Sequence, residues 1–181
     1  AIPNGMDYSH LKIDSFVLKA NDMVFTPTGY FGNIVHTSFR EKSGFNLAQL
    51  KANFAYNDSG FALKNLLVQT DNTIIQNSIA ANYPSIEAIT KDIGKLYLDA
   101  EFKNSRIAVK DILLLSPQAA PYLKGFGSSV LAVNAGIKGY VKDLSLSGVQ
   151  LGGIGNTALT MNGIIKGLPD PNKTSFDINL D

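Results

Sequence analysis

The sequence has no cysteine and no tryptophan, and few charged residues. Without cysteine, the chain can form neither a disulfide framework nor a thiolate nucleophile. The 16 Lys and Arg residues nearly balance the 15 Asp and Glu residues, so the basic surface that marks nucleic-acid-binding proteins is missing. The longest apolar runs, such as residues 112–115, are far shorter than the roughly 20 residues of a membrane-spanning helix. We therefore expect no nucleic-acid partner and no transmembrane segment in this fragment.

The motifs of catalytic and metal sites are also missing, including HExxH, GxSxG and a phosphate-binding loop with its lysine. His10 and His36 are expected to be ordinary strand residues, since a metal or catalytic site needs several convergent groups. The glycine-rich residues 152–155 are not followed by a helix, so they indicate a strand turn. Asp99 and Glu101 fit the solvated face of a strand. The sequence therefore predicts a protein that is not an enzyme, with no catalytic residues, no metal and no cofactor.

Hydrophobic residues make up 45% of the chain, which is typical of a folded domain, and 181 residues are enough for one. The chain begins at Ala1 without an initiator methionine and ends at Asp181 directly after a strand-like run. We therefore expect residues 1–181 to be one segment of a larger protein.

A repeated apolar pattern in residues 43–52 and 59–68 is the most informative feature that is present. Apolar residues alternate, two residues intervene, and the alternation then resumes. Alternation predicts a strand that is buried on one face. A bulge at each interruption, at Ala48 with Gln49 and at Lys64 with Asn65, would keep both apolar halves on that face and bend the strand. The pattern therefore predicts a curved sheet with one apolar face.

Two further segments, residues 107–114 and 141–146, resemble the same pattern. Their interruptions would place bulges at Lys110 with Asp111 and at Lys142 with Asp143. Asp111 could instead cap a helix that begins at Ile112, and this alternative stays open.

Alternating segments elsewhere predict most of the remaining strands, and turn-prone residues separate them. Breaks are expected at Asn21 with Asp22 and at residues 103–105. A Pro, a Gly and isoleucines at helical spacing predict a short helix over residues 84–94. Residues 116–123 should form a second short helix or an irregular lid. The expected strands span residues 11–18, 30–40, 74–82, 96–102, 129–137, 139–146, 149–151, 157–165 and 174–180.

These elements predict an all-β fold with one or two short helices. One short helix cannot cover the apolar face of so many strands, so a second sheet or an external ligand must cover it. Composition alone favours the second sheet, which would give a closed β-sandwich or barrel.

The repeat, residues 40–45 and residues 96–105 resemble the repeats of the AsmA-like superfamily, and most closely its TamB-type translocation and assembly proteins. The resemblance extends from Tyr8 to Leu146. It implies a curved, mainly antiparallel sheet folded into an open taco or gutter, with the β-sandwich as the alternative. It also implies a periplasmic location in a diderm bacterium, in a protein anchored in the inner membrane.

The resemblance further implies a hydrophobic groove that carries phospholipid toward the outer membrane or assists protein assembly there. Phospholipid acyl chains would be the partners, together with an outer-membrane β-barrel assembly protein. The alternative function is a periplasmic adaptor or chaperone segment that binds outer-membrane protein strands by β-augmentation. The expected groove-lining residues are Phe45, Leu47, Leu50, Ala52, Phe61, Leu63, Leu66, Val68, Ile107, Val109, Ile112, Leu114, Val141, Leu144 and Leu146.

Overall fold

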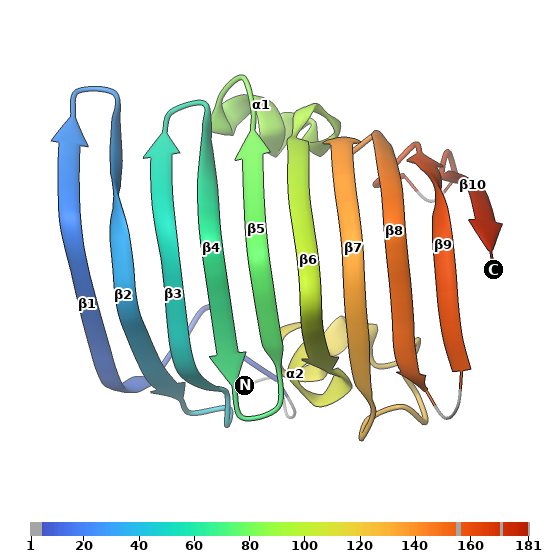
Figure 1. Ribbon diagram of the computed structural model, residues 1–181, viewed down its shortest axis with the longest axis horizontal. Coiled ribbons are helices and arrows are strands. Elements are labelled where there is room, and N and C mark those ends of the chain that lie inside the picture. The colour runs from blue at the N-terminus through green and yellow to red at the C-terminus, as the bar shows by residue number, and fades with distance from the viewer. Residues whose placement is uncertain (1–4, 155–156, 171, 181) are drawn as a thin grey trace.

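A computed structural model describes residues 5–154, 157–170 and 172–180 as one antiparallel sheet of ten strands (Figure 1). Strand order follows chain order, and each strand pairs with its neighbours in sequence. The sheet does not close on itself, so the open all-β fold is confirmed and the closed sandwich is wrong for the described residues. The strands are β1 (Ile13–Thr26), β2 (Gly29–Glu41), β3 (Asn46–Asn57), β4 (Gly60–Thr70), β5 (Ile74–Asn82), β6 (Tyr97–Ala108), β7 (Val130–Tyr140), β8 (Asp143–Ile154), β9 (Thr157–Lys166) and β10 (Ser175–Leu180).

Two short helices lie behind the sheet in Figure 1, at opposite ends of the strands. Helix α1 (Ile86–Lys91) begins after Ser85, whose hydroxyl accepts a hydrogen bond from the N–H of Ala88, and the 3-10 turn η1 (Ile93–Lys95) follows it. The helix expected in this region is therefore confirmed. Helix α2 (Val109–Leu115) and the 3-10 turn η2 (Pro117–Ala119) lie at the other end.

The two bulges expected in the repeat are present. The β3–β4 register shifts between Leu47 and Gln49 and again beside Asn65, which has a φ of 51°. Asn tolerates this left-handed conformation better than most residues, because its short polar side chain can hydrogen-bond locally. The repeat therefore bends each strand without turning its apolar side chains away from one face.

The two further copies of the pattern, at residues 107–114 and 141–146, were expected to be bulged strands. This prediction is wrong, because neither segment is one continuous strand. Residues 109–115 form α2 instead, which follows the helical alternative more closely, although the helix begins at Val109 rather than at Ile112. Residues 141 and 142 form the turn between β7 and β8, and Asp143 begins β8. Val141 donates its N–H to the carbonyl of Leu96, which fixes that turn.

Two expected breaks are bulges rather than turns. Strand β1 continues through Asp22, which has a φ of 52°, and β6 continues through Asn104, which has a φ of 51°. The same residue types that allow a tight turn also allow a bulge, so both strands are longer than the sequence predicts. Gly155, Ala1 and Asp181, on which expectations also rested, lie outside the described residues.

Apolar packing is concentrated in two clusters on one face of the sheet. The first contains Met6, Phe45 and Leu47, with side chains of β2 to β4 packed against it. The second contains Val133, Ala135 and Val149, with side chains of β6 to β9 around it. The buried residues are thus divided between the two halves of the sheet.

Candidate functional site: an apolar groove

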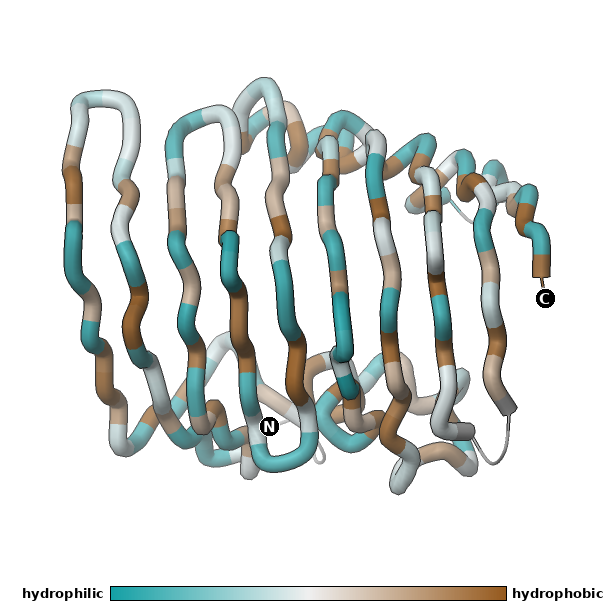
Figure 2. Tube along the Cα trace, in the orientation of Figure 1, coloured by the Kyte–Doolittle hydropathy of each residue, from teal (hydrophilic) through white to brown (hydrophobic). Residues whose placement is uncertain are grey.

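The strand register places apolar side chains in continuous rows on one face of the sheet, because paired residues of neighbouring antiparallel strands share a face. We call this face the inner face and the opposite one the outer face. Hydrophobic and hydrophilic residues alternate along the strands accordingly (Figure 2). The row nearest the β1–β2 turn contains Phe25, Tyr30, Tyr56, Phe61, Ala81, Leu98, Gly139, Leu144, Ile165 and Phe176. The next inner row contains Gly32, Phe54, Leu63, Ile79, Ala100, Ile137, Leu146, Gly163 and Ile178.

Bulges extend these rows toward the other end of the strands. Lys64 lies on the outer face, and the amide of Asn65 bonds to the outer-face residue Asn53 at 2.6 Å. Because these two consecutive residues both point outward, Leu66 returns to the inner face, followed by Val68. In β7, Val133 and Ala135 pack with Leu146 of the second row, so the apolar surface is continuous past the bulges there as well.

The inner face is an open apolar surface, since no second layer covers it in the described part of the chain, and we call this surface the groove. Leu63, Ile79 and Ile137 in its middle are only partly buried. Ten strands spaced about 4.8 Å apart make a surface about 43 Å long. This length exceeds the depth of one leaflet of a bilayer, about 15 Å of hydrocarbon.

Helix α2 covers one end of the groove and is held there by a buried hydrogen bond. The hydroxyl of Thr70 in β4 donates to the carboxylate of Asp111 at 2.5 Å, and both residues are buried. The same hydroxyl accepts the N–H of Thr73 at 2.9 Å, which closes the β4–β5 turn. Val109, the first residue of the helix, is 1% exposed. Helix α1 at the opposite end buries none of its own residues, and the inner-face side chains of Phe25, Tyr30 and Phe61 there are exposed, so we call this the open end.

The segment before β1 crosses the same end as α2. The N–H of Met6 bonds to the carbonyl of Leu114 at 2.8 Å, and the Met6 side chain packs on Phe45 and Leu47. Beside it, the carboxylate of Glu41 accepts the N–H of Ser43 at 2.6 Å and that of Lys12 at 3.1 Å.

These contacts lower the pKa of Glu41 to about 2. Ser43 is the main cause: its hydroxyl lies near the carboxylate, although it does not meet the geometry of a full hydrogen bond, and its N–H adds to the effect. The charged Glu41 therefore fixes the chain where the segment before β1 meets the β2–β3 turn.

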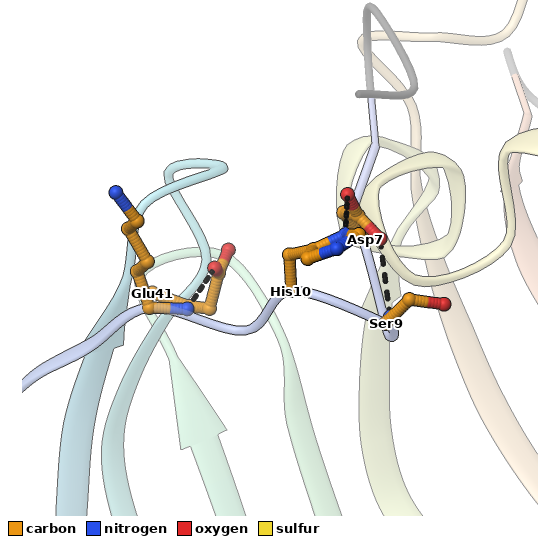
Figure 3. A network of polar contacts seen from close by, with 5 residues as sticks. Asp7, Ser9, His10 and Glu41 are labelled. Atoms are coloured by element: carbon orange, nitrogen blue, oxygen red, sulfur yellow. Dashed lines mark hydrogen bonds and ion pairs between the residues drawn. The ribbon is translucent and has the colours of Figure 1, made fainter.

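A hollow of about 410 Å³ lies beside Glu41, and Asp7 and His10 are among its lining residues (Figure 3). The ring nitrogen Nδ1 of His10 lies 3.1 Å from a carboxylate oxygen of Asp7, which lowers the pKa of Asp7. His10 precedes β1 and is therefore not the strand residue that we expected, whereas His36 lies in β2. The His10 side chain is 81% exposed. No cluster of three metal-ligating side chains occurs in the described residues.

The outer face is polar at the level of the bulges. An unbroken chain of side-chain hydrogen bonds runs across four strands, through Asp22, Asn33, Asn53 and Asn65. Similar contacts continue it beyond β4, where Asn77 donates to Glu101 at 2.7 Å and Asn134 donates to Gln150 at 3.2 Å. The outer face therefore holds the bulges in place with polar contacts, while the inner face stays apolar.

Most of the expected lining residues lie on the inner face. Those on its strands are Leu47, Leu50, Ala52, Phe61, Leu63, Leu66, Val68, Ile107, Leu144 and Leu146. Phe45 lies just before β3 in the first cluster. Val109, Ile112 and Leu114 belong to α2 at the covered end, and Val141 lies in a turn, so these four do not line the sheet.

The sequence reasoning missed several lining residues. Leu98, Ala100 and Phe102 alternate in β6, and Ile79 and Ala81 alternate in β5, so the signal for these positions was available. Phe61 of the aromatic row at the open end was expected, but Phe25, Tyr30 and Tyr56 were missed because only the strand register aligns them with it.

None of the helices in the described residues is long and apolar enough to cross a membrane. Comparisons with protein-family models, with curated proteins and with solved structures found no match for this chain.

Proposed function

We propose that the inner face binds the acyl chains of phospholipids, and that the chain is a segment of a periplasmic, AsmA-like protein that carries lipid toward the outer membrane. The observation that supports this proposal is the continuity of the first apolar row across all ten strands, and of the second from β2 to β10, on a face that no second layer covers in the described residues. An exposed apolar surface of this extent on a folded protein usually marks a binding site.

The groove suits a ligand that slides rather than one held at a single point. Its inner rows hold no charged side chains that could anchor a headgroup, so binding would depend on apolar area, at about 25 cal/mol per Å². Because adjacent strands repeat the same apolar rows about 4.8 Å apart, neighbouring positions bind an acyl chain about equally well. A headgroup would stay in water along the open side.

Photo-crosslinking in cells tests this function. A photoreactive residue at Ile137, on the inner face, is expected to capture phospholipid, whereas one at Ser145, on the outer face of the next strand, is not. The substitution Leu146→Asp, directly opposite Ile137, should lower that capture about tenfold, because a charge removes the apolar surface of the row. Ser145→Asp is the matched control. Equal capture at Ile137 and Ser145, with circular dichroism unchanged, would contradict the proposal.

Strand addition at β1 is the second candidate function, and its support is the exposure of this edge strand. Nearly every residue of β1 is exposed, and its outer edge has no partner strand in the described residues. Bulges at Ser15 and Asp22 interrupt that edge, however, and such irregularities hinder pairing with another strand. Crosslinks from Lys19 to an outer-membrane protein, with none to lipid at Ile137, would favour this function over the first.

A further inference from the structure

The open end of the groove is apolar on both faces of the sheet. On the inner face, the first row includes Phe25, Tyr30, Tyr56 and Phe61. The outer-face row beside it continues from Val24 and Phe31 through Ala55, Ala62 and Ala80 before it meets the ion pair of Asp99 with Lys138. The solvent-exposed face of an antiparallel sheet is normally polar, so an apolar row on the outer face at this end requires an explanation.

We call this part the aromatic rim and define it as Val24, Phe25, Tyr30, Phe31, Tyr56 and Phe61. All six side chains are exposed, and Phe25 is the most exposed at 69%. Phe25 and Tyr30 meet edge to face with ring centroids 5.7 Å apart, and Tyr30 stacks on Tyr56 at 6.1 Å. The rings therefore form one ordered surface although they contact solvent.

The rim also lacks charge. No Asp, Glu, Lys or Arg occurs in residues 23–39, which comprise the end of β1, the turn at Pro27 and most of β2. A shallow hollow of about 290 Å³ on this end of the sheet is lined by Phe31, Ala55 and Ala62 among others. Charged side chains reappear on the outer face of β1 to β4 only at the bulges and beyond, as at Lys64.

We propose that the aromatic rim docks into the surface of a lipid bilayer. A protein partner seated on one face, or a strand added at the β1 edge, would leave the opposite apolar row in water. A bilayer surrounds both faces of an inserted hairpin, and Tyr and Phe side chains are favourable at its interface. Asp58 is exposed in the β3–β4 turn, and its charge would keep that turn at the level of the headgroups while the uncharged β1–β2 turn goes deeper.

The absence of tryptophan makes a direct test simple. The variants Phe25→Trp on the inner face, Phe31→Trp on the outer face and Ile164→Trp each carry a single fluorophore. Ile164 is the matched control, since it lies in the same outer-face row as Phe31, on β9. The probe is a vesicle of phosphatidylcholine with brominated acyl chains. We expect quenching and a blue-shifted emission at Phe25→Trp and Phe31→Trp and neither at Ile164→Trp, with no dependence on salt because no charge is involved.

Quenching at Phe25→Trp without quenching at Phe31→Trp would overturn the proposal, because it would mean that lipid enters the groove from the inner face alone. A blue shift without quenching, with a doubled mass in solution, would also overturn it and indicate pairing of two copies. Ile137 lies away from the rim, so crosslinking there tests lipid binding to the groove and not membrane docking by the rim. The two proposals can therefore fail independently.

Thr28→Asp gives a second test that does not depend on a side chain in the sheet. Thr28 is exposed in the β1–β2 turn, so the fold should tolerate the substitution. A charge at the tip should lower flotation with the vesicles about tenfold or more, whereas Ile164→Asp should leave flotation unchanged. Unchanged flotation of Thr28→Asp would contradict insertion of the hairpin.

Discussion

Single Asx and glycine residues with positive φ determine the shape of this sheet. Asp22, Asn65, Asn77, Asn104 and Gly148 each occupy the left-handed region, and each lies beside a register shift. Each such bulge adds one residue to its strand and increases the local twist and bend. Because these residues recur across the sheet, the curvature of the groove is distributed over many strands.

The substitution Asn65→Ala tests this role. Alanine loses the amide hydrogen bond to Asn53 and must adopt a φ of 51°, so we expect the free energy of unfolding to fall by about 1 to 2 kcal/mol. Asn65→Gly loses the same hydrogen bond but adopts this φ without strain, and its loss should be smaller by about 1 kcal/mol. Urea unfolding measures both variants. Equal losses would show that the φ of Asn65 carries no strain.

The carboxylate of Glu41 should make stability depend on pH. Its pKa is about 2 in the folded protein, below its ordinary value of 4.5, so the unfolded chain binds a proton before the folded one does. The stabilisation is therefore complete above pH 4.5 and is lost as the pH falls from there to about 2. We expect Glu41→Gln to lower the melting temperature at neutral pH, and this difference to shrink over that range. Glu87→Gln on α1 is the control and should change the unfolding free energy by less than about 0.5 kcal/mol.

At the scale of elements, the sequence identified strands well but confused bulges with turns. Alternation predicted β5 at its observed bounds and the bulge at Asn65, because it reflects which face is buried. Asp22 and Asn104 suggested breaks but form bulges, and Lys142 suggested a bulge but lies in a turn. A positive-φ residue allows both outcomes, and only pairing with the neighbouring strand decides between them. Helix α2 was ambiguous for a similar reason, since its apolar residues fit a bulged strand as well as a helix.

The hydrogen bond between Thr70 and Asp111 should hold α2 over its end of the groove. Asp111→Ala leaves a buried hydroxyl without its acceptor, so we expect a loss of about 2 kcal/mol in the free energy of unfolding. Hydrogen exchange should accelerate at the amides of Val109–Leu115 and little elsewhere. Asp99→Ala removes an exposed ion pair and should cost less than about 1 kcal/mol. Unchanged exchange in α2 would mean that apolar contacts alone hold the helix.

For the whole molecule, composition favoured a closed sandwich and the family resemblance implied an open sheet, but neither could show that apolar packing is divided between the two halves of that sheet. Every strand pairs with its neighbours in sequence, so each half of the sheet is stabilised by contacts within itself. The cluster around Leu47 is confined to β2 to β4 with Met6 from the segment before β1, and the cluster around Val133 to β6 to β9. Proteins built in this linear way have stabilities that are nearly sums of neighbouring terms, and their parts can open separately.

The two halves of the groove should therefore respond separately to cavities. Val133→Ala removes apolar contacts in the second cluster, and we expect a loss of about 2 kcal/mol together with faster hydrogen exchange in β6 to β9. Leu47→Ala should do the same in β2 to β4 and leave β7 and β8 protected. Faster exchange throughout the sheet in either variant would contradict this independence. If the halves do open separately, one half of the sheet can loosen while the other keeps its shape, and the proposed acyl-chain ligand would need only such a local change to move along the inner face.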